Sequence, residues 1–99
     1  MKPTSVHRPE YVALIALLKE YRLKAGLTQV AVAEKLGISQ TGVSDIEVGS
    51  RGVDFLVARD LCKLYGRTLD HLSADLDKRL LDEKIEPAPR IKRKDRMRL

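Results

Sequence analysis

Aromatic residues and cysteines are scarce in this chain of 99 residues. It has no tryptophan, one phenylalanine, three tyrosines and one cysteine. A single cysteine excludes an internal disulfide and a zinc cluster built on cysteines, and it is typical of a reducing compartment. With so few aromatic residues, a core has to be built from leucine, valine, isoleucine and alanine, which favours packed helices over a sheet.

Long hydrophobic runs are also missing. The longest apolar stretch, Tyr11 to Leu18, is too short to span a membrane. Residues 1–8 lack the apolar core of a signal peptide, and we expect them to form a flexible leader. The sequence therefore predicts a cytoplasmic protein with no membrane-spanning segment.

Acidic side chains are outnumbered, since 14 Asp and Glu residues face 19 Lys and Arg residues and give a net charge of +5. This balance favours an anionic partner, and nucleic acid is the first choice. The excess is greatest at the end of the chain, where Arg90 to Leu99 carry six basic side chains and one acidic side chain. We expect residues 87–99 to form a basic, disordered tail.

Apolar spacing and capping residues predict five helices. Pro9 fits the first turn of a helix that runs to about Ala25, and further helices are expected over 29–36, 40–48, 55–65 and from 69 onward. The last helix, or a sixth one after Ser73, is expected to continue to about Ile85. The first helix has one predicted apolar face, made of Leu14, Leu17, Leu18, Tyr21 and Ala25, and the fourth is expected to run through Leu56, Val57, Leu61, Leu64 and Tyr65.

The most informative stretch is 28–47. Two short helices begin with a hydroxyl residue followed by glutamine, at Thr28-Gln29 and Ser39-Gln40, and Gly37 makes a tight turn between them. This is the layout of a helix-turn-helix, whose second helix can lie in the major groove of DNA.

Several segments in order resemble the Xre/Cro/CI family of bacterial and phage regulators over about residues 10–72. They are Leu27 to Gln29, Ala33 to Gln40, Val43-Ser44, Ile46-Glu47 with Gly49, and Leu64 to Leu72. The resemblance implies an all-α, compact five-helix, lambda-repressor-like bundle that binds operator DNA, generally as a dimer. Residues 9–72 would form this DNA-binding domain, and residues 73–86 a C-terminal helical extension.

The resemblance also implies roles for individual residues. Gln40 matches a base-reading glutamine, and Gln29 matches a glutamine that contacts a phosphate and braces the base-reading side chains. Arg22 and Glu47 match a structural ion pair between the first and third helices. Base choice would be tuned from Thr41, Gly42, Ser44 and Asp45.

The chemistry of these side chains agrees with such roles. The Gln40 amide both donates and accepts, so it can pair with adenine, and Asp45 can accept from cytosine. The backbone N–H groups at the helix starts, beside Thr28 and Ser39, attract phosphate. In the loop after the third helix, Arg51 is the main candidate for a cationic phosphate contact.

The sequence thus predicts a homodimeric transcriptional regulator, a repressor, that binds a near-palindromic operator in double-stranded DNA. No nucleophile–base set, metal cluster or phosphate loop is recognisable, so we expect neither enzymatic activity nor a cofactor. Two alternatives keep the fold: an antitoxin whose residues 73–99 bind a toxin, and a protein-interaction module without DNA binding. The leucines between Leu69 and Ile85 fit either the core or a dimer contact, with the dimer contact favoured. Cys62 is expected to be a buried, inert thiol.

Overall fold

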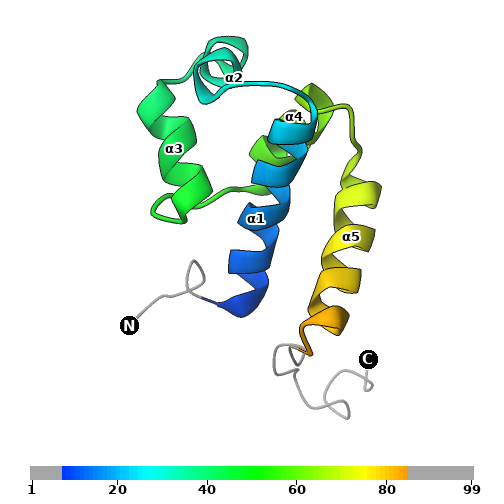
Figure 1. Ribbon diagram of the computed structural model, residues 1–99. Coiled ribbons are helices and arrows are strands. Elements are labelled where there is room, and N and C mark those ends of the chain that lie inside the picture. Colours follow the sequence, from blue (N-terminus) through cyan, green and yellow to red (C-terminus); the bar gives the residue numbers. More distant parts are fainter. Residues whose placement is uncertain (1–7, 85–99) are drawn as a thin grey trace, which may run out of the picture.

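Five α-helices make up residues 8–84, the part of the chain that this computed structural model describes (Figure 1). They are α1 (Pro9–Lys24), α2 (Gln29–Leu36), α3 (Gln40–Val48), α4 (Phe55–Leu64) and α5 (Leu69–Asp82). The predicted all-α fold with five helices is confirmed. The leader up to residue 7 and the basic tail over 87–99 lie outside the described residues.

Capping side chains define where four of the helices start. In each case a side-chain oxygen accepts a hydrogen bond from the backbone N–H three residues ahead, and the capping residues are Thr28, Ser39, Asp54 and Thr68. Left-handed glycines end the two short helices: Gly37 has φ 73° after α2, and Gly49 has φ 84° after α3. The bounds of α2 and α3 agree with the predicted ranges.

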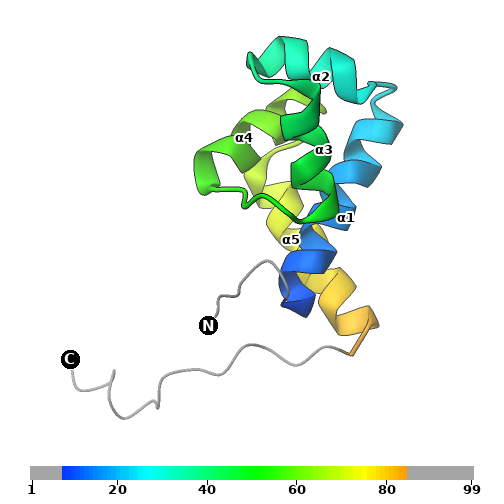
Figure 2. The same ribbon diagram turned by 90° about the vertical axis from the view of Figure 1, so that its left-hand side faces the viewer.

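Helix α1 lies at the centre of the bundle, with α3 on one side and α5 on the other (Figures 1 and 2). Its buried side chains are Ala13, Ile15, Leu17, Leu18, Tyr21 and Arg22. The sequence predicted one apolar face for this helix, but α3, α4 and α5 all pack against it, so its buried residues lie on more than one face. Ala25, predicted on that face, is the exposed C-cap residue of α1, so its placement was wrong.

The inner face of α4 is formed by Ala58, Leu61 and Cys62, and burial raises the pKa of the Cys62 thiol. Leu56, one of the apolar residues expected along this helix, lies off this face, and 66% of its surface is exposed. At 100° per residue, Leu56 points to the opposite side of the helix from Ala58 and Cys62.

Helix α5 is one continuous helix over Leu69–Asp82, so no sixth helix begins between Ser73 and the last described residue, Lys84. Three of its leucines pack on the core, namely Leu69, Leu72 and Leu76. Most of the α5 leucine stripe is therefore used within the chain. None of the helices in residues 8–84 combines the length and the apolar character that crossing a membrane requires.

Candidate nucleic-acid interface

Helices α2 and α3 form one side of the domain, which faces the viewer in Figure 2. Val43 and Ile46 point into the core and hold α3 in place. The residues predicted to contact bases lie on the outer side of α3: Gln40 and Thr41 are exposed, and Ser44 and Asp45 are half-buried. The structure thus presents all four on one accessible strip of α3.

A chain of hydrogen bonds leads from the start of α3 into the core. The Gln40 Nε2 donates to Gln29 Oε1 at 2.7 Å, and the Gln29 Nε2 donates to Glu47 Oε1 at 3.0 Å. The Arg22 guanidinium donates to both oxygens of Glu47, at 2.6 and 3.1 Å, and to the backbone carbonyl of Leu27 at 2.8 Å. Three helices, α1, α2 and α3, are joined by this chain.

The direction of these hydrogen bonds is fixed from the buried end. A guanidinium can only donate and an ionised carboxylate can only accept, so Glu47 must receive a donor from Gln29. The Gln29 amide then has to turn its Nε2 toward Glu47 and its Oε1 toward Gln40. Because Gln29 offers an acceptor, Gln40 has to offer its Nε2. The exposed amide of Gln40 is in this way held in one of its two possible orientations.

Arg22 and Glu47 are a buried pair, with side chains only 8% and 5% exposed. The hydrogen bond to Glu47 raises the pKa of Arg22, which stays charged. Their contact ties α1 to α3, so the pair belongs to the folding of the domain.

Arg51 lies over the first turn of α3, next to Gly42. A Cβ built on Gly42 would be 2.8 Å from Arg51 Nη1 and 3.4 Å from Ser39 Oγ. Gly42 is buried, so the structure places it beneath Arg51 instead of on the accessible strip of α3. The side chain of Arg51 itself is exposed. A cation is thus held beside the N-terminal end of the predicted recognition helix.

The capping hydroxyls lie at the starts of α2 and α3. Thr28 Oγ1 accepts from the Ala31 N–H, and Ser39 Oγ accepts from the Gly42 N–H, both at 3.0 Å. A hydroxyl that accepts in this way keeps its own proton for donation. Both side chains can therefore cap a helix and still donate to a phosphate oxygen.

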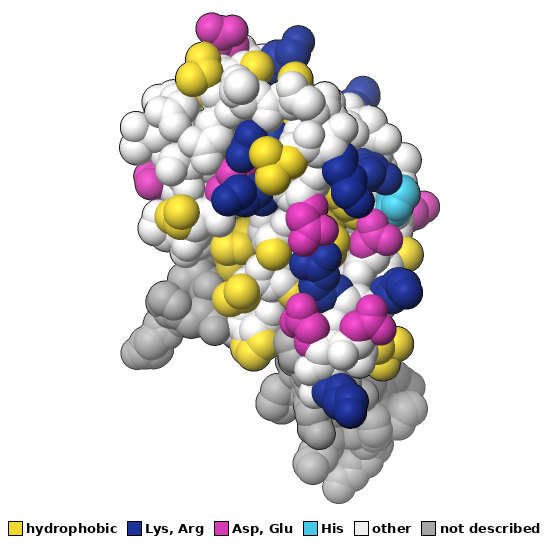
Figure 3. Space-filling model, in the orientation of Figure 1, with side chains coloured by type: hydrophobic (Ala, Val, Ile, Leu, Met, Phe, Trp, Pro, Cys, Tyr) yellow, Lys and Arg dark blue, Asp and Glu magenta, His cyan; other side chains and the backbone are white. Residues whose placement is uncertain are grey.

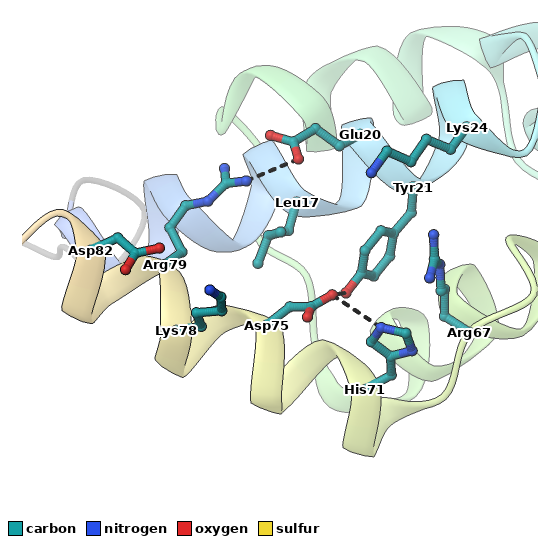
Figure 4. A pocket seen from close by; sticks show the side chains of 10 residues that line it. All are labelled: Leu17, Glu20, Tyr21, Lys24, Arg67, His71, Asp75, Lys78, Arg79 and Asp82. Carbon is teal, nitrogen blue, oxygen red and sulfur yellow. Dashed lines mark hydrogen bonds and ion pairs between the residues drawn. The ribbon is translucent and has the colours of Figure 1, made fainter.

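A groove lies between α1 and α5, on the side of α1 that is opposite to α3, and no sequence motif indicated it (Figure 4). The Tyr21 hydroxyl donates to Asp75, and His71 Nε2 lies 3.3 Å from the same carboxylate. The guanidinium of Arg67 stacks on the Tyr21 ring, with its carbon 4.6 Å from the ring centre. Burial and then the hydrogen bond to Asp75 raise the pKa of Tyr21. The polar groups of these residues contact one another, and these contacts join α5 to α1.

On the face drawn in Figure 3, charged side chains of both signs alternate over α5, whereas few charged side chains are visible over α3. Within residues 8–84, no three His, Cys, Asp or Glu side chains converge in a way that could hold a metal ion.

A protein-family model described as helix-turn-helix matches residues 18–72. The chain belongs to the helix-turn-helix family. The match begins within α1, contains the hydrogen-bond chain from Arg22 to Gln40, and ends in the first turn of α5. The resemblance to Xre/Cro/CI-type regulators is confirmed by this match. No curated protein matches the chain at a significant level.

Membership of the helix-turn-helix family gives this chain a function of the DNA-binding, transcription-regulator type, with DNA as a partner. Its α2 and α3, with Gly37 between them, have the layout expected of that motif, two short helices joined by a tight turn.

Proposed function

We propose that this helix-turn-helix protein is a sequence-specific transcriptional repressor of bacterial or phage type, with α3 in the major groove of double-stranded DNA. The proposed base contacts are Gln40, Thr41, Ser44 and Asp45. The proposed phosphate contacts are Thr28, Gln29, Ser39 and Arg51. As a homodimer it would read a near-palindromic operator, with the two α3 helices about one helical turn, ~34 Å, apart.

The observation that carries this proposal is the orientation of the Gln40 amide. Its bond to Gln29 uses only one of the two hydrogens on Nε2. The second hydrogen is available to adenine N7, and Oε1 is available to the adenine N6 amino group. An amide already held in one orientation loses less conformational freedom on binding than a free one, and it favours one pattern of donor and acceptor over its reverse.

Arg51 and the start of α3 support the phosphate contacts. Three features meet there: an exposed guanidinium, the hydroxyl of Ser39 and the positive end of the α3 dipole. Together they favour an anion placed beside the first turn of the helix whose exposed side chains would read the bases.

Selection of bound sequences from a random duplex pool at near-physiological salt tests the proposal. We expect enrichment of a palindrome by the wild type, and loss of its base preference at defined positions in Gln40→Ala and Thr41→Ala. Enrichment that both variants leave unchanged, or no enrichment at all, would contradict recognition through α3.

A phosphate-contact variant provides the matched control. Arg51→Gln should weaken binding to all duplexes by a similar factor and lower the dependence of log affinity on log salt by about one contact, with the selected sequence unchanged. A changed sequence preference in Arg51→Gln would instead assign Arg51 to base recognition.

A further inference from the structure

The first turn of α4 exposes two large apolar side chains in succession. Phe55, the only phenylalanine of the chain, is 71% exposed, and Leu56 is 66% exposed. We name these two residues the α4 patch. Seven residues before Phe55, α3 ends at Val48, which is 70% exposed as well. Single apolar side chains are common on protein surfaces, but a consecutive phenylalanine and leucine form a larger apolar area that water disfavours.

The α4 patch lies beside the predicted recognition helix. Figure 2 shows the start of α4 at the edge of the domain alongside α3, joined to its end by the loop over 49–54. Consider a second copy that contacts this edge and is related to the first by a two-fold axis along the viewing direction of Figure 2. Rotation about this axis keeps the same side of the molecule toward the viewer, so the α3 helix of the second copy also faces the viewer. Docking at the α4 patch therefore lets two α3 helices face the same side of one duplex.

The charges near the patch fit a second copy of the chain. Arg59 and Asp60 lie one turn further along α4, and Asp54 and Arg51 precede the patch in the loop. These two cations and two carboxylates balance one another among the sequence neighbours of the patch, in a chain whose net charge is +5. Two-fold docking needs a surface that is complementary to itself, and such a mixed rim pairs opposite charges when it meets its own copy. A strongly acidic or strongly basic partner would meet like charges there.

The other surface considered for a contact between two copies, on α5, exposes less apolar area. Leu69, Leu72 and Leu76 pack on the core, and Leu81 remains as a single large apolar side chain that is 77% exposed. An isolated exposed leucine is ordinary for a soluble surface.

We infer that the α4 patch is the surface on which a second copy of this chain docks. The inference rests on the proposed function in one respect, because a near-palindromic operator is the reason for two-fold symmetry. The contact joins the two copies beside the groove that their α3 helices enter, and it makes their binding to adjacent half-sites cooperative.

Sedimentation of the full-length protein without DNA tests the interface, with Leu56→Lys and Leu81→Lys as a matched pair. Both leucines are exposed, so both variants should fold as the wild type does, which thermal unfolding checks. We expect the wild-type mass to rise above 11.2 kDa toward twice that value as the concentration approaches about 1 mM. Leu56→Lys should weaken this association at least about tenfold, and Leu81→Lys should leave it unchanged.

Two results would overturn the inference. One is a wild type that stays monomeric over the whole concentration range, which would assign the α4 patch to a different protein. The other is an association that Leu81→Lys weakens and Leu56→Lys does not, which would place the interface on α5.

A DNA measurement separates this inference from the proposed function. On the selected palindrome, Leu56→Lys should lose cooperativity while its affinity for an isolated half-site is kept or increased by the added positive charge. If no duplex is bound selectively, the proposed function fails, and the sedimentation result still decides the interface.

Discussion

Gly42 lies directly beneath the Arg51 guanidinium, where an added Cβ would be 2.8 Å from Nη1. A real Cβ does not tolerate such a distance, so any side chain at position 42 would force the guanidinium to shift from its place over the first turn of α3. Glycine inside a helix costs about 1 kcal/mol relative to alanine. The chain thus has a less stable α3 together with a cation beside its N-terminal end, which is the trade expected where binding is favoured over stability.

Gly42→Ala should therefore stabilise the protein and weaken its binding to DNA. The clash falls on the far end of a flexible, exposed side chain, and the other neighbours of the added Cβ lie at ordinary contact distances. We expect the free energy of unfolding in urea to rise by up to about 1 kcal/mol. Affinity for the selected duplex, measured at fixed salt, should fall because Arg51 is displaced.

Two comparisons show whether this effect passes through Arg51. In an Arg51→Gln background, Gly42→Ala should cause no further loss of DNA affinity, since the group that it displaces is already gone. Gly52→Ala is the matched control, because a Cβ there meets no atom within 4 Å. Equal losses from Gly42→Ala with and without Arg51 would refute the displacement.

Gln29→Ala should relax base choice at the position read by Gln40. Removing Gln29 leaves the Gln40 amide without the acceptor that sets its orientation, so both orientations become accessible. We expect weaker discrimination between adenine and other bases at that position in a selection from a duplex pool. In a Gln40→Ala background, Gln29→Ala should not change this discrimination further, and an additional change would indicate that Gln29 reads a base itself.

The ends of α2 and α3 could be predicted because their signals are local: a capping hydroxyl starts each helix, and a glycine with positive φ ends it. The contacts that complete the site are not local. The position of Arg51 beside Gly42 depends on the conformation of the loop that follows α3. The hydrogen bond between Tyr21 and Asp75 joins residues 54 apart in the sequence. The rotation of α4 about its axis depends on its packing against α1 and α5, so the apolar residues along this helix did not by themselves show that Leu56 is exposed.

The two Glu–Arg pairs of α1 should differ strongly in their contribution to stability. Glu47→Ala leaves the buried Arg22 guanidinium without its carboxylate and should cost about 3–5 kcal/mol. Glu20→Ala breaks a pair with a single contact, between Glu20 Oε1 and Arg79 Nη2 at 2.9 Å, and the two side chains are 45% and 26% exposed. Solvent screening limits that loss to about 1 kcal/mol. Urea unfolding at neutral pH measures both, and equal losses would contradict the role of burial.

Tyr65 should make the protein less stable in alkali. Burial, and secondarily the charge of Glu47, raise the pKa of Tyr65 to about 12, against about 10 in an unfolded chain. Above about pH 10 the unfolded state therefore loses a proton that the folded state keeps. The stabilising contribution is complete below that pH, and it decreases by up to about 1.4 kcal/mol per pH unit as the pH rises toward about 12.

Tyr65→Phe isolates this effect, because it keeps the ring in the core and removes the group that titrates. Its free energy of unfolding should decrease less than that of the wild type between about pH 10 and about pH 11. Tyr21, whose pKa is also raised, is present in both proteins, so its contribution cancels in the difference. The measurement is urea unfolding of the two proteins at matched pH values. Parallel pH profiles would mean that the Tyr65 hydroxyl ionises equally easily in the folded and unfolded chains, and would place it in contact with water.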